Sequence, residues 1–110
     1  ITKGFRDDGS LVEEQTFRHL LQKALDEESD LEWKVINAGV GGNTTDDALK
    51  RIDADVLDHN PDYVTIMFGV NDASLLSFPD FRERHEPRVP LDRFERNLET
   101  IIEKIGKVGA

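Results

Sequence analysis

Two short loops carry residue types that could do chemistry. The first, "NAGVGGNTT" over residues 37–45, places three glycines before Asn43 and two threonines, and the second, "GVND" over residues 69–72, ends in an amide and a carboxylate. Glycine has no Cβ, so a glycine-rich turn lets another group approach the backbone N–H donors closely. The first loop could therefore cradle a phosphate, bind an oxyanion or simply make a tight bend.

The composition excludes several classes of partner and site. The chain has 110 residues, a net charge of −9 and no cysteine. Binding to nucleic acid draws most of its affinity from clustered lysine and arginine, so we expect no nucleic-acid partner. The lack of cysteine excludes disulfides, thiolate metal sites and a cysteine nucleophile. No apolar run approaches the length of a membrane span, and none is expected.

The segments around the two loops have the patterns of helices and strands. Apolar residues at helical spacing predict helices over residues 11–27 and 91–105, with a further helix directly after the first loop. The run "EWKVIN" over residues 32–37 is typical of a short strand. The run "YVTIMF" over residues 63–68 is nearly continuous in apolar residues, which is typical of a strand covered on both faces.

Local signals predict where these helices begin and end. Ser10 with Glu13 forms a capping-box pattern before the first helix, and Thr44 with Asp47 can cap the second. Gly106 is expected to stop the last helix.

The alternation of helices and strands predicts an α/β fold. Strands joined by helices pair in parallel through right-handed crossovers, which gives a three-layer α/β/α sandwich around a parallel sheet. Two strands make a poor sheet, so we expect residues 1–110 to be a single, incomplete domain with further strands before Ile1 and after Ala110. Uncovered sheet edges invite association, so we also expect this segment alone to self-associate or to need a complementing chain.

Ligands in such a fold bind beyond the carboxyl ends of the strands, where both loops would lie. The opening "ITKG" would lie there too. Together "ITKG", "NAGVGGNTT" and "GVND" resemble, in order and spacing, the first three conserved blocks of the SGNH or GDSL hydrolases. The resemblance implies a flavodoxin-like fold, hydrolysis of a small-molecule ester by a serine nucleophile, and no metal or organic cofactor.

The resemblance also implies roles for two residues. Gly42 would offer its backbone N–H, and Asn71 its side-chain amide, to the oxyanion of a tetrahedral intermediate. Asp72 is interpreted as a helix cap or as an acceptor that holds its loop. The family's nucleophilic serine would stand directly before Ile1, and no Asp-x-x-His pair occurs in the sequence. Residues 1–110 by themselves are therefore expected to be inactive.

Other residues and other functions are compatible with parts of the sequence. Ser10, Ser74 and Ser77 are the other candidate hydroxyls near the motifs, and His85 is the histidine with the best chance of bordering a crevice, because His19 and His59 fall within or at the end of helices. One alternative function is a nucleotide-binding α/β module with phosphate at the start of the second helix. The other is a non-catalytic interaction domain of flavodoxin-like architecture.

Overall fold

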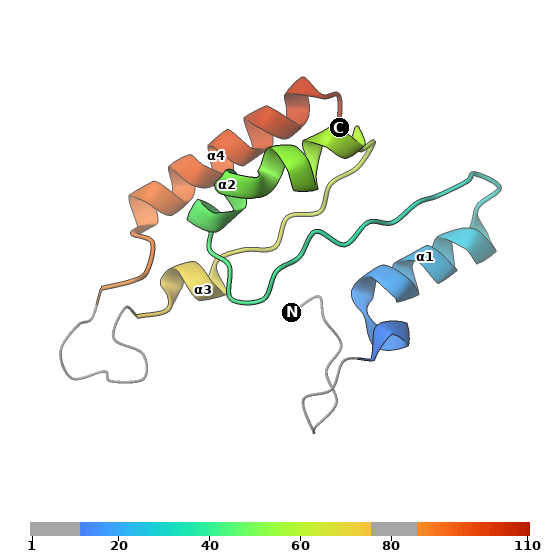
Figure 1. Ribbon diagram of the computed structural model, residues 1–110, viewed down its shortest axis with the longest axis horizontal. Coiled ribbons are helices and arrows are strands. Elements are labelled where there is room, and N and C mark those ends of the chain that lie inside the picture. Colours follow the sequence, from blue (N-terminus) through green and yellow to red (C-terminus); the bar gives the residue numbers. More distant parts are fainter. Residues whose placement is uncertain (1–11, 76–85) are drawn as a thin grey trace. The chain divides into compact units, whose positions relative to one another are not determined.

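The computed structural model describes residues 12–75 and 86–110 of the chain (Figure 1). The chain divides into two compact units, residues 1–41 and residues 42–110. Within the described ranges, the first unit contributes helix α1 and the second contributes helices α2, α3 and α4. That residues 1–110 form one incomplete domain stays a prediction.

In the first unit, the 3-10 helix η1 (Glu13–Gln15) precedes α1 (Phe17–Glu28). Thr16 caps α1, because its Oγ1 accepts a hydrogen bond from the N–H of His19 at 3.2 Å. The helix therefore begins at Phe17 and not at residue 11 as predicted. Ser10, the predicted cap, lies outside the described residues.

The chain after α1 is hydrogen-bonded to that helix by the side chain of Gln22. The amide nitrogen of Gln22 donates to the carbonyl of Trp33 at 2.8 Å, and its amide oxygen accepts from the N–H of Val35 at 2.7 Å. The indole N–H of Trp33 donates to the hydroxyl of Ser29 at 2.9 Å. The stretch predicted as the first strand is thus held by a helix side chain.

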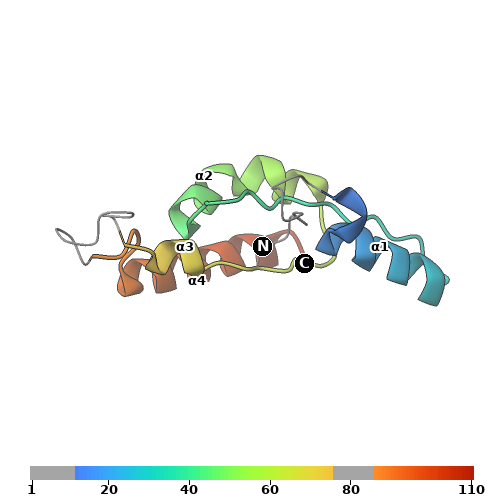
Figure 2. The same cartoon turned by 90° about the horizontal axis from the view of Figure 1, so that it is seen from below.

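In the second unit, α2 (Thr45–Asp55) runs into the 3-10 helix η2 (Leu57–His59), and α3 (Val70–Ala73) and α4 (Leu91–Lys107) follow. Figures 1 and 2 both show α4 lying along α2. The core between these two helices consists of four buried aliphatic side chains: Ala48, Ile52, Ile101 and Ile105. Their spacing of four residues on each helix is what the helical pattern predicts.

The ends of α2 and α4 test the predicted caps. Thr44 caps α2 as predicted, and with Asp47 it forms a full capping box, in which each side chain accepts from the backbone N–H of the other. Gly106 does not stop α4, which continues to Lys107. The chain leaves the helix through Gly109, whose φ of 91° is in the region that favours glycine.

The predicted α/β/α sandwich is wrong for this structure. The described residues contain no β-strand or sheet, and only an isolated antiparallel bridge joins Leu75 to Pro87. The "YVTIMF" run is covered on one side only, since Val64 and Phe68 pack against the core while Tyr63 and Met67 are 77% and 70% exposed. An apolar run shows that a segment can be buried, whereas a strand also needs a partner backbone at the right distance, and the described residues do not supply one.

Candidate functional site

The first loop turns sharply at Gly42. This residue has a φ of 81°, in the left-handed region that side chains disfavour. A Cβ added there would meet open space, so glycine is required by the backbone angle and not by crowding. Its carbonyl accepts a hydrogen bond from Nη1 of Arg88 at 3.1 Å. Gly42 is exposed, and within residues 12–75 and 86–110 no backbone–backbone hydrogen bond uses its N–H.

The second loop brings Asn71 to the first. Gly69, with a φ of 123°, turns the chain into the single turn of α3. From that turn, Nδ2 of Asn71 donates to the carbonyl oxygen of Asn43 at 2.9 Å. The two sequence motifs, 28 residues apart, are thus in direct contact one residue from Gly42. The amide carries two protons and this bond uses one of them.

Asp72 makes a second connection between the same loops. Its Oδ1 accepts from the N–H of Thr45 at 2.8 Å and from the Thr45 hydroxyl at 2.6 Å. The predicted role of Asp72 as an acceptor that holds its loop is therefore confirmed, and the partner is the start of α2. Both residues are buried, Thr45 completely.

Asn97 joins this network from α4, and sequence reasoning missed it. Its Nδ2 donates to Oγ1 of Thr45 at 3.0 Å and to Oδ1 of Asp46 at 2.8 Å. A signal was present in the sequence, because Asn97 stands four residues before Ile101 and eight before Ile105 and so belongs to the buried stripe of α4. A polar residue on a core-facing stripe points to a buried hydrogen bond.

Two residues that precede α4, Arg88 and Val89, are hydrogen-bonded to α3 and to the residue that follows it. The N–H of Arg88 donates to the carbonyl of Ser74 at 2.8 Å, and the N–H of Val89 donates to the carbonyl of Asp72 at 3.0 Å. The hydroxyl of Ser74 donates to the carbonyl of Asn71 at 2.6 Å. Ser74 therefore acts as a local hydrogen-bond donor within the turn.

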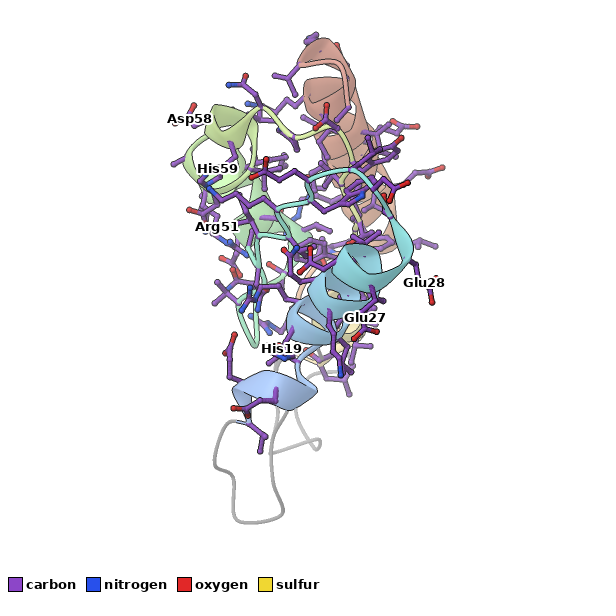
Figure 3. The ribbon with its side chains drawn as sticks, turned by 90° about the vertical axis from the view of Figure 1, so that its right-hand side faces the viewer. His19, Glu27, Glu28, Arg51, Asp58 and His59 are labelled. Carbon is purple, nitrogen blue, oxygen red and sulfur yellow. The ribbon has the colours of Figure 1, made fainter. Side chains whose placement is uncertain are left out.

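His19 and His59, the two histidines in the described ranges, make none of the hydrogen bonds of this network. His19 belongs to α1 in the first unit, while Asp58 and His59 lie in η2, which follows the opposite end of α2 from Thr45 (Figure 3). His85, Ser77 and the "ITKG" motif fall outside the described residues. The described candidate site thus consists of Gly42, Asn71 and the hydrogen bonds that join Asp72, Thr45 and Asn97.

The carboxylates of Asp47 and Asp72 already accept hydrogen bonds from backbone N–H groups at the start of α2. The pKa of Asp47 is lowered from 3.8 to about 2, first by the N–H of Thr44, then by the Thr44 hydroxyl, and then by Lys50. The Thr45 N–H is bound to Asp72, and the Asp47 N–H points to the Thr44 hydroxyl at 3.4 Å. A phosphate would need these same N–H groups. The arrangement therefore disfavours the nucleotide-binding alternative.

The described ranges show neither a metal cluster nor a membrane-spanning helix. In residues 12–75 and 86–110, no three histidine or acidic side chains gather as a metal site. None of the helices in these ranges combines the length and the apolar character needed to cross a membrane.

Comparisons with known proteins identify a family and two relatives. A model of the GDSL-like lipase/acylhydrolase family matches residues 1–110. The chain is 47% identical over 75 residues to the uncharacterized lipoprotein YqeF of Bacillus subtilis (strain 168), a match that covers 68% of this chain and 28% of that protein. It is 37% identical over 70 residues to an acetylxylan esterase of Geobacillus stearothermophilus, which covers 63% of this chain and 31% of that protein. The matched region is thus less than a third of each relative, and no solved structure matches the chain significantly.

Proposed function

The chain belongs to the GDSL-like lipase/acylhydrolase family, and from this premise we propose that the protein hydrolyses carboxylic esters. The family resemblance of the three sequence motifs is confirmed by this membership. The protein as a whole, and not this segment by itself, is proposed to carry the activity, with a serine as nucleophile.

We assign two oxyanion donors to this segment. They are the backbone N–H of Gly42 and the side-chain amide of Asn71. The observation that carries the assignment is the 2.9 Å hydrogen bond from the Asn71 amide to the carbonyl of Asn43, since it joins the two motifs and holds the amide beside Gly42. The bond orients the amide and leaves its second proton for a ligand.

The proposed chemistry is acyl transfer in two steps. A serine oxygen attacks the ester carbonyl while a base takes its proton, and the carbonyl oxygen becomes an oxyanion. The C–O bond to the alcohol then breaks, the alcohol receives the proton, and water hydrolyses the acyl-serine in the same manner. Donors that are already oriented where the negative charge develops are worth about 3 kcal/mol of barrier each. Gly42 and Asn71 would act at this point.

The first substrates to test are acetyl esters of carbohydrates. A relative that is 37% identical to the chain is an acetylxylan esterase, and its matched part includes more than half of this segment. We propose the same substrate class for this protein, with p-nitrophenyl acetate as the general probe of acyl transfer.

The decisive variant is Asn71→Ala in the complete protein. Because the amide bonds the oxyanion mainly in the transition state, kcat should fall by about 10²- to 10³-fold while KM changes little. Hydrolysis of p-nitrophenyl acetate and of acetylated xylan measures both constants, and the thermal midpoint of the same preparation reports the fold.

The matched control is Ser74→Ala in the same turn. It removes the bond to the Asn71 carbonyl but leaves the Asn71 amide in place, so kcat should change by only a small factor. An unchanged kcat with a lowered midpoint in Asn71→Ala would make Asn71 a turn residue. A wild-type protein that hydrolyses neither substrate would favour the non-catalytic alternative.

A further inference from the structure

Asp72 is buried with one carboxyl oxygen unused. The side chain is 2% exposed, and its Oδ2 has no hydrogen-bond partner among the described residues. A buried polar atom without a partner lowers stability, so native structures keep few of them. The two bonds made by its other oxygen are the contacts that can offset this cost.

Those two bonds align the loops of the candidate site. Asn71 and Asp72 are neighbours in the single turn of α3, and they bond to Asn43 and Thr45 in the first loop. The two side chains therefore connect the turn to the first loop at two adjacent positions.

The main chain of Asp72 is held as well. Its carbonyl accepts from the N–H of Val89. The turn begins at Gly69, where an added Cβ would lie 3.6 Å from a ring carbon of Phe94 in α4. Thr45, the partner of the Asp72 side chain, is itself held by Asn97 of α4. Asp72 thus connects α3 to the start of α2 and to the segment that precedes α4.

We propose that Asp72 is a positioning residue for ester hydrolysis. Its two hydrogen bonds to Thr45 hold the Asn71 amide and the Gly42 turn in one fixed arrangement. This inference rests on the proposed function. Asp72 does not touch the substrate and acts through Asn71. A displacement of about 1 Å in a donor can lower the rate by about 10²-fold, so loss of the Asp72–Thr45 hydrogen bonds should lower kcat.

The test uses four variants of the complete protein with p-nitrophenyl acetate as substrate. Asp72→Ala should lower kcat by about 10- to 10²-fold with little change in KM. Asp72→Asn should recover most of that loss, because an amide oxygen can accept both bonds from Thr45. Asp92→Ala removes an exposed carboxylate of α4 and serves as the control, with kcat unchanged.

The fourth variant combines Asp72→Ala with Asn71→Ala. If Asp72 acts through Asn71, the double variant should be scarcely slower than Asn71→Ala alone, because the donor to be positioned is already absent. Effects that multiply in the double variant would overturn the proposal. So would an Asp72→Ala protein with a lowered thermal midpoint and a normal kcat.

A second measurement separates this inference from the proposed function. In ¹⁵N-labelled protein, Asp72→Ala should shift the side-chain amide resonances of Asn71 and speed their exchange with solvent, and Asp72→Asn should restore them. Where Asp72→Ala does not fold, Thr45→Val removes the hydroxyl from the other side of the same bond and should give the same shift. Unaltered Asn71 resonances would overturn the positioning role, whereas a wild-type protein without esterase activity would overturn only the proposed function.

Discussion

The two units of the chain contrast in what holds them together. In the first, α1 has no buried residue, Phe17 and Leu20 are 51% and 55% exposed, and the side-chain bonds to the following chain span 11 and 13 residues. In the second, two helices share a buried core, and side-chain bonds join positions 27 to 52 residues apart. Helices α1, α2 and α4 are all amphipathic, but in the described ranges only α2 and α4 bury apolar residues, and the candidate site lies in their unit.

The largest effect should come from the core of the second unit. Ile101 is 2% exposed and Ile102, its neighbour in α4, is 59% exposed. Ile101→Ala leaves a cavity between α2 and α4 and should lower the free energy of unfolding by about 2–5 kcal/mol. Ile102→Ala should change it by less than about 0.5 kcal/mol. Chemical denaturation of the complete protein measures both.

The Ile102→Ala control also tests whether the exposed face of α4 is covered in the complete protein. A large loss for Ile102→Ala would show that the second face of α4 is covered in the complete protein. That result would also support the prediction that this segment needs a complementing chain. Equal and small losses for both variants would contradict the core described between α2 and α4.

A smaller effect separates the helix caps of the two units. Thr44→Ala and Thr16→Ala each remove a hydroxyl that accepts from the first turn of a helix, a loss of about 1 kcal/mol. In the second unit that loss should lower the stability of the cooperative core. In the first it should mainly increase local opening of α1, because no residue within α1 itself is buried.

Amide hydrogen exchange distinguishes these two outcomes. Thr16→Ala should speed exchange within α1 and leave the protection of α2 and α4 unchanged, whereas Thr44→Ala should speed exchange throughout the second unit. A uniform loss of protection in Thr16→Ala would show that α1 unfolds together with α2 and α4. That result would contradict the difference in cooperativity between the two units.

The smallest effect is a pH dependence at the start of α2. The pKa of Asp47 is about 2 in the folded chain, below its ordinary value of 3.8, because the N–H and the hydroxyl of Thr44 favour the charged form. The folded state therefore binds this proton more weakly than the unfolded state. The stabilisation is present above about pH 4 and is lost as the pH falls towards 2.

Thermal midpoints between pH 5 and pH 2 measure this dependence. Asp47→Asn should give a flatter profile over that window than the wild-type protein. Asp53→Asn, which removes an exposed carboxylate from the same helix, should leave the Asp47 contribution to the slope in place. Identical profiles for wild type and Asp47→Asn would contradict the assigned pKa.

Much of the site was open to prediction from the sequence. The glycine-rich turn and the acceptor role of Asp72 were inferred from local residue types, because turns and caps depend on residues close together in the chain. The role of Asn71 was inferred from the family resemblance of the motifs and stays a prediction. The partner of Asp72 and the part played by Asn97 were not inferred. Those bonds join residues 27 and 52 apart, and no local pattern specifies which distant hydroxyl a buried carboxyl or amide will meet.

The sequence by itself determined the presence of α1, α2 and α4, though not the start of α1 or the end of α4, together with the Thr44 cap and the family. Helical hydrogen bonds close within four residues, and a motif depends only on the order of residues. Only the tertiary structure decided that "EWKVIN" and "YVTIMF" form no strand in the described residues, and that Thr45 joins α2, α3 and α4. The physical reason is the same for both. Strand pairing and buried polar networks each require a partner from a distant part of the chain, and that partner exists only when the chain has folded.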